Sequence, residues 1–385
     1  MILYKPWPDG WNYGGVHDMD IYLNERYDKK FVIIQFPWPC HDSEKYEECT
    51  FTENPNNDSW ISAKEALSEV EFDYIVIYEP VEWTFLKEPI KDYYNFFKFC
   101  GIPMDKIIYQ GANHEVEKYY EHANIDKKMR FKSVGFNHCL ISSLSTHRDV
   151  LNDYTQDVKF DGSKLFICPM SAITDHRELL YNKLEKSNLL ESGHVSARWK
   201  GVYLDELGVA TEQTLPQPNF VESIIPYYED SFCTVVTESE YDFYNVRFTE
   251  KFYFPIMYNR PFMILGAPTL LKWIKKYGFE TFPELFDERY DEEYDLKKRT
   301  EIIIENLKKL QDKSNQELQD LLEIVKPKII HNKNLLKKYA NCSLSNDAYE
   351  ELLDSMEIPL GEQLKKYGIR QYDYATTSIE NNPLL

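Results

Sequence analysis

The sequence has no long apolar run and no paired cysteines. No stretch approaches the roughly 20 apolar residues that a bilayer-spanning helix needs, and the N-terminus MILYKPWPDGWNYGG lacks the apolar core of a signal peptide. The 7 cysteines stand singly, without a CxxC pair or the spacing of a disulfide framework. We therefore expect a cytoplasmic protein that does not span a membrane and keeps its thiols reduced.

Positive charge is also scarce. The chain carries 44 Lys and Arg against 64 Asp and Glu, which gives a formal net charge of −20. An acidic surface repels nucleic acids and anionic membranes, so a general role on either partner is disfavoured. A local basic pocket remains compatible with this composition.

Several familiar catalytic and metal-binding motifs are missing. The sequence contains no GxxxxGK[ST], GxGxxG or GxSxG run, which disfavours P-loop, dinucleotide and α/β-hydrolase chemistry. The triplet Asp18-Met19-Asp20 precedes the first predicted strand, whereas a metal-binding DxD should end one. His114 and His122 lie more than one helical turn apart, unlike the HExxH pair, and the acidic run 287–299 lacks EF-hand spacing. We predict neither a bound metal nor a cofactor.

Apolar runs alternate with amphipathic segments in the first part of the chain. This alternation predicts a parallel sheet wrapped by helices. The predicted strands are 31–36, 73–80, 106–111 and 136–144, and helical segments are predicted over 61–71 and 91–101.

A second series of the same kind follows. Strands are predicted at 164–170, 231–239 and 260–268, with helices over 176–185 and from about 249, and the chain becomes helical from about 295. We expect an α/β fold of two Rossmann-like, doubly wound lobes that face each other across a cleft, with a helical C-terminal extension. The expected domains are 1–158, 159–344 and a tail over 345–385.

Two predicted helix starts combine an N-cap with an unusual cation. Thr174 and Thr249 are suitable N-caps, which places Arg177 and Lys251 in first helical turns. The helix macrodipole opposes a cation at this end, unless a bound anion such as a phosphate lies there. The alternative is that both cations are solvated or paired with neighbouring carboxylates.

The stretch 248–299 resembles the donor-binding end of the α1,3-fucosyltransferase-like group of GT-B glycosyltransferases. In that family a strand precedes a helix that starts with the sequence TEK, and a strand that begins with proline and ends in glycine follows. The counterparts here are TVVTES, the TEK at 249–251, and the segment 261–266. The resemblance covers roughly 164–310.

This resemblance implies a function and three site residues. The family's glutamate and lysine of the TEK motif contact a nucleotide-sugar donor, which implies this role for Glu250 and Lys251. An arginine that opens an earlier helix contacts the donor pyrophosphate, and Arg177 matches it by its place after KLFICPM. The implied activity is metal-independent, inverting transfer of a sugar to a glycan or other hydroxyl acceptor.

An inverting transfer also requires a base for the acceptor hydroxyl. Carboxylates and histidines that follow the predicted strands of the first lobe are the candidates: His41, Asp42, Glu79, His114 and Glu115. Glu79 is the preferred catalytic residue because it lies directly at a strand end, before a proline. The alternative function is a non-catalytic carbohydrate-binding or virion-associated accessory protein on the same fold.

Overall fold

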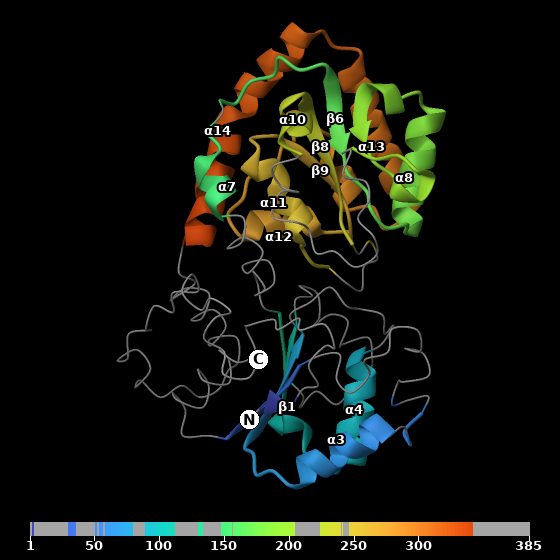
Figure 1. Cartoon of the computed structure of the whole chain (residues 1–385), viewed down its shortest axis with the longest axis vertical. Helices are drawn as coiled ribbons and strands as arrows, with labels where there is room; N and C mark the ends of the chain where they lie inside the picture. The colour runs from blue at the N-terminus through green and yellow to red at the C-terminus, as the bar shows by residue number, and fades with distance from the viewer. Residues whose placement is uncertain are drawn as a thin grey trace. The chain divides into compact units, whose positions relative to one another are not determined.

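The chain folds into two compact units, each with its own parallel sheet (Figure 1). The described residues up to 133 belong to the first unit, and those from 148 onward belong to the second. These observations confirm the predicted α/β class with parallel sheets. The computed structural model describes residues 2–3, 30–35, 51, 54–56, 58–79, 89–111, 130–133, 148–155, 157–204, 224–239, 241 and 246–341.

The sheet of the first unit follows the order of the sequence. Its five described strands are all parallel and lie in the order β1-β2-β3-β4-β5. Their bounds are β1 Ile2–Leu3, β2 Phe31–Gln35, β3 Tyr74–Glu79, β4 Ile107–Gly111 and β5 Arg130–Ser133, with α3 Asp58–Ser68, α4 Pro89–Phe99 and the 3₁₀ turn η2 Met104–Lys106 between them.

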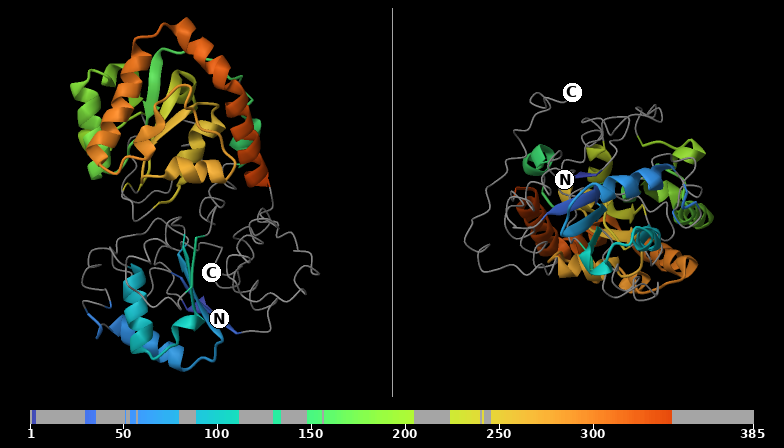
Figure 2. Two further views of the ribbon diagram at one scale, coloured as in Figure 1. Left: turned by 180° about the vertical axis from the view of Figure 1, so that it is seen from behind. Right: turned by 90° about the horizontal axis from the view of Figure 1, so that it is seen from below.

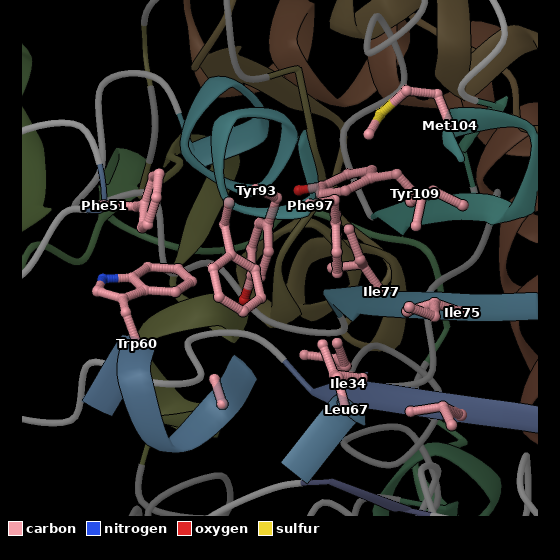
Figure 3. Packing of buried hydrophobic residues seen from close by; sticks show 14 residues of the cluster. Ile34, Phe51, Trp60, Leu67, Ile75, Ile77, Tyr93, Phe97, Met104 and Tyr109 are labelled. Atoms are coloured by element: carbon pink, nitrogen blue, oxygen red, sulfur yellow. The ribbon is translucent and has the colours of Figure 1, made fainter. Parts of the chain in front are cut away.

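Aromatic and branched side chains fill one side of this sheet (Figure 3). Ile34 and Ile77 of the sheet belong to the same buried cluster as Trp60 of α3 and Phe97 of α4. Both described helices therefore cover the same face. Right-handed crossovers between parallel strands in sequential order place their helices on one face of the sheet. The sequential strand order of the first unit therefore differs from the doubly wound arrangement expected for the first lobe.

The sheet of the second unit reverses its strand order. Its four described strands are parallel and lie in the order β7-β6-β8-β9, so the chain moves in one direction from β6 to β7 and in the other from β8 to β9. This order is compatible with the Rossmann-like, doubly wound topology predicted for the second lobe. The strands are β6 Lys164–Cys168, β7 Gly193–Val195, β8 Ser231–Thr237 and β9 Phe262–Leu265.

Helices cover both faces of this second sheet. In Figures 1 and 2, α8 and α13 lie on one side, and α11 and α14 lie on the other. The described helices of this unit are α7 Arg148–Asp153, α8 Asp175–Lys186, α10 Ile225–Glu229, α11 Glu250–Met257, α12 Leu270–Lys276, α13 Leu296–Gln311 and α14 Asn315–Asn341. The described part of this unit also contains three 3₁₀ turns, η3 Leu190–Ser192, η4 Arg198–Lys200 and η5 Glu288–Asp291.

Helix α7 belongs to the second unit, although the expected first domain extends to residue 158. Leu151 and Tyr154 are buried, and α7 packs against α14. Lys333 of α14 also donates a hydrogen bond to the Tyr154 carbonyl at 2.7 Å. The boundary between the two units therefore lies before Arg148. The apolar side of α7 is buried against α14, which belongs to the second unit.

Predicted elements agree with the structure where a strand or helix is long and apolar. All seven residues of β8 are buried, and α13 begins at Leu296, close to residue 295, where the sequence predicts that the chain becomes helical. Strands β1, β5 and β7 were not predicted, because they are short or polar. The strand expected at 136–144 lies outside the described residues. None of the described helices is long and apolar enough to cross a membrane.

Candidate functional site

A cavity of about 150 Å³ opens in the second unit at the carboxyl ends of its central strands. It is lined by residues 169–171 after β6, Ser196 after β7, and Thr237 at the end of β8. The strand order reverses between β6 and β8, and doubly wound sheets bind their ligands in the crevice at this point. The topology itself therefore provides a candidate binding site.

The cavity is cationic although the protein is acidic. Its charged lining residues are Arg177, Arg198 and Lys251, and no described carboxylate lines it. In a chain of net charge −20, such a segregation of cations creates a local potential that attracts anions. The first and last of these residues are the two cations singled out from the sequence.

Arg177 lies in the first turn of α8, as predicted, and is only 4% exposed. Its Nη2 donates to the carbonyls of Thr237 (3.0 Å) and Glu238 (3.2 Å), and its Nη1 donates to the Ala172 carbonyl (3.2 Å). These bonds join the start of α8 to the end of β8. Carbonyls are dipoles rather than anions, so these contacts orient the guanidinium without cancelling its charge.

The neighbouring His176 is a neutral part of the same junction. Its Nε2 lies 2.8 Å from the Glu238 carbonyl, and its Nδ1 lies 3.0 Å from the Thr174 hydroxyl. Because a carbonyl can only accept, Nε2 carries the hydrogen and Nδ1 accepts from Thr174. Burial, followed by the charge of Arg177, lowers the pKa of His176 to about 3. Thr174 occupies the N-cap position as predicted, but its hydroxyl contacts this ring instead of capping the backbone.

Lys251 is held at the start of α11 by a set of hydroxyl groups. Thr249 caps the helix as predicted, because its Oγ1 accepts from the Lys251 backbone nitrogen at 3.3 Å. The Lys251 ammonium donates to Thr249 Oγ1 (3.1 Å) and Ser239 Oγ (3.2 Å). The fully buried Glu238 carboxylate accepts from the hydroxyl and the backbone nitrogen of Thr249. Glu238 thus orients Lys251 through Thr249.

Uncharged groups form the remainder of the cavity. Thr234 and Thr237 are each 1% exposed, and their hydroxyls find no hydrogen-bond partner among the described residues. Both threonines line the cavity, together with apolar or aromatic residues such as Tyr228 and Phe254. Buried polar atoms in proteins are rarely left without a partner, so these hydroxyls indicate contacts that a ligand or solvent supplies.

The structure brings together two of the residues singled out from the sequence. Arg177 and Lys251 line one cavity, and Glu250 begins α11 beside Lys251. Glu79 ends β3 in the first unit. The side chains of Glu250 and Glu79 lie outside the described part of the structure. The other base candidates, His41, Asp42, His114 and Glu115, lie wholly outside it, as does the Asp18–Asp20 triplet.

Arg198 is the lining cation that sequence reasoning missed. It lies in η4, just after β7, a strand of only three residues that has no recognisable pattern. The detectable signal was a basic residue in the sequence GHVSARWK, immediately after a possible strand. Among the described residues, no group of three or more His, Cys, Asp and Glu side chains is arranged to hold a metal ion.

No protein-family model, curated protein or solved structure matches this chain. The cavity, its charges and the sequence motifs around it are therefore the features that indicate a function.

Proposed function

We propose that this protein is a glycosyltransferase whose second unit binds a nucleotide-sugar donor in the cationic cavity. The observation that supports this most is that Arg177 and Lys251, from the first turns of two different helices, line one cavity at the strand-order reversal. Phosphates are the usual anions at such an edge. The resemblance of 248–299 to the fucosyltransferase-like group favours a nucleotide sugar among phosphate-containing ligands.

The proposed reaction places negative charge where the cavity is positive. The acceptor oxygen forms a bond to the anomeric carbon as the bond from that carbon to the diphosphate breaks. The departing nucleoside diphosphate keeps the electron pair, and Arg177, Lys251 and the two helix N-termini stabilise it. Side chains supply this charge, so the mechanism needs no metal ion. Glu250 is proposed to bind hydroxyls of the donor, and Glu79 to accept the proton of the acceptor hydroxyl.

Nucleotide binding by charge variants tests the donor site. Arg177→Ala and Lys251→Ala should each weaken nucleoside-diphosphate binding by about 1.5–3 kcal/mol, the scale of a charge-assisted hydrogen bond. The two losses should not add if both side chains contact one phosphate group. Lys186→Ala is the control, because Lys186 is exposed in the last turn of α8, at the opposite end from Arg177.

Thermal unfolding with UDP, GDP and their sugar conjugates provides the measurement. A ligand at 100 times its dissociation constant adds about 2.7 kcal/mol to stability, which such an experiment resolves. The proposal predicts stabilisation of the wild type by at least one nucleoside diphosphate and a smaller effect in both charge variants. A wild type that none of these ligands stabilises would contradict the donor site.

The non-catalytic alternative is favoured by one observation. The Arg177 guanidinium already holds three backbone carbonyls together, which is also a structural role. A carbohydrate-binding or virion-associated accessory protein could keep this junction without catalysing transfer. Release of nucleoside diphosphate from a nucleotide sugar, measured with acceptor glycans and with EDTA present, separates the two functions. Transfer in EDTA supports the enzyme, and donor binding without release supports the alternative.

A further inference from the structure

Arg198 differs from the other two cations of the cavity in the partners of its side chain. Arg177 donates to backbone carbonyls, and Lys251 donates to Ser239 and Thr249. Within the described part of the chain, the Arg198 guanidinium makes no hydrogen bond or ion pair, although it is half-buried and lines the cavity. A guanidinium has five N–H donors. Among the described residues, none of these five donors of Arg198 is used within the protein, so they can form hydrogen bonds with a ligand in the cavity.

The backbone of Arg198 is held in a tight turn at the cavity edge. An isolated antiparallel bridge pairs Ala197 with Val202, with hydrogen bonds of 2.9 and 3.2 Å. Gly201 closes the turn in the left-handed region, at φ 72°, and its backbone nitrogen donates to the Arg198 carbonyl at 2.9 Å. Glycine adopts this conformation without steric cost. The turn therefore fixes where Arg198 enters the cavity before any ligand binds.

The charge of the lining indicates how many phosphate groups the ligand carries. Three cations with no described carboxylate exceed what one phosphate group needs, because a single arginine can bind a phosphate with two parallel hydrogen bonds. We propose that Arg198 is a ligand-binding residue that contacts a phosphate group and makes the cavity prefer a nucleoside diphosphate to a monophosphate. This inference rests on the proposed function, because it concerns the ligand of the same cavity.

The uncharged part of the lining defines the rest of this ligand. The Thr234 and Thr237 hydroxyls, beside Tyr228, Val236 and Phe254, suit a neutral group that has both hydrogen-bonding atoms and an apolar surface. A nucleoside has these properties, and inorganic pyrophosphate does not. Comparing the two ligands therefore separates the anion site from the nucleoside site.

Isothermal titration calorimetry on the full chain tests the inference. The ligands are UDP, UMP, GDP, GMP and inorganic pyrophosphate, and the variants are Arg198→Ala and Arg198→Lys. Arg198→Ala should weaken binding of the diphosphate about 10-fold to 100-fold and of the monophosphate less than about threefold. Arg198→Lys should be intermediate, because lysine keeps the charge but not the fork of donors.

Lys200→Ala is the matched control. Lys200 lies in the same 3₁₀ turn, is exposed, and lies over the Tyr181 ring at 5.9 Å instead of lining the cavity. Its removal changes the net charge equally but should leave affinity for both nucleotides within about twofold, because exposed charges are screened. An equal loss in the two alanine variants would show a general charge effect and overturn the inference.

The remaining outcomes distinguish this inference from the proposed function. Diphosphate binding that Arg198→Ala leaves unchanged, or an equal loss for diphosphate and monophosphate, overturns the role of Arg198 and leaves the donor site standing. Pyrophosphate binding that Arg198→Ala abolishes, without binding of any nucleotide, supports the anion site and overturns the nucleotide-sugar function. No binding of any of these anions to the wild type overturns both.

Discussion

The buried threonine hydroxyls of β8 are polar groups that the described residues do not satisfy. Thr234 illustrates this, since it is 1% exposed and lines the cavity. Thr234→Val keeps the shape of the side chain and removes the hydroxyl. We expect the free energy of unfolding to rise by about 1 kcal/mol, because a buried hydroxyl without a hydrogen-bond partner lowers stability. Nucleoside-diphosphate binding should weaken, because the hydroxyl can no longer form a hydrogen bond with the ligand. Urea unfolding and calorimetry measure the two effects.

Ser231 provides the control on the same strand. It is buried too, but its hydroxyl donates to the Tyr227 carbonyl at 2.7 Å. Ser231→Ala should therefore destabilise the protein by about 1 kcal/mol without affecting binding. A Thr234→Val variant that is also destabilised, and that binds normally, would show that the hydroxyl has a structural partner such as buried water.

Site residues that contradict a local rule of helix formation could be predicted from the sequence. Arg177 and Lys251 stand out because a cation in the first turn opposes the helix dipole, and both line the cavity. Glu238 gives no such signal, because a carboxylate at a strand end is unremarkable until its burial beneath Thr249 is known. Arg198 gives only a weak signal, a basic residue after a possible strand, because the turn that positions it is made by backbone bonds.

At the scale of elements, helix α12 depends on a carboxylate from a distant turn. Thr269 precedes the helix at φ 71° and does not cap it with its side chain. Asp291 of η5 does so instead, accepting from the backbone nitrogens of Leu271 (3.0 Å) and Lys272. Burial of Asp291 outweighs these bonds and raises its pKa from 3.8 to about 6. The acidic run 287–299, which lacks EF-hand spacing, therefore contains a buried titrating group.

This shift predicts a pH dependence of stability. The folded state binds more protons than the unfolded state between pH 3.8 and about 6, so the contribution of Asp291 is most favourable below 3.8 and is lost as the pH rises through 6. We compare the free energy of unfolding of Asp291→Asn with that of the wild type at two pH values. The variant's value minus the wild-type value should be about 2 kcal/mol lower at about pH 4.5 than at about pH 7.5. Urea unfolding at each pH measures this difference. A difference that does not vary with pH would show that Asp291 is ionised throughout.

Elements were predictable in proportion to the apolar surface that they bury. Strands β6, β8 and β9 are covered on both faces and form continuous apolar runs, so their positions were predicted. The sequence RFKS of β5 has no such run, and β7 is too short to show a period. The sequence predicts parallel sheets, but it does not predict which strands are neighbours, because strand pairing depends on contacts between distant segments.

At the scale of the whole molecule, the two units differ in the strand order of their sheets and in the sheet faces that helices cover. The first has a sequential order with both described helices on one face, and the second has a reversal with helices on both. Only a reversal separates neighbouring crossover connections and creates a crevice at the carboxyl edge. The described cavity with its three cations lies in the second unit for this reason, even though both units looked alike in sequence.

The position of β8 also makes it a reporter of unfolding. All seven residues of β8 are buried, and β6 and β9 hydrogen-bond to its two sides, whereas β7 pairs only with β6 among the described strands. Backbone amides in such a central strand exchange with deuterium only when the whole unit opens, while edge strands exchange by fraying. Mass spectrometry should therefore find 231–237 among the slowest-exchanging segments and 193–195 much faster. A ligand bound in the cavity should slow exchange in 231–237, because exchange then requires the unit to unfold against the added binding free energy. The exchange rate of this strand therefore reports whether the cavity is occupied.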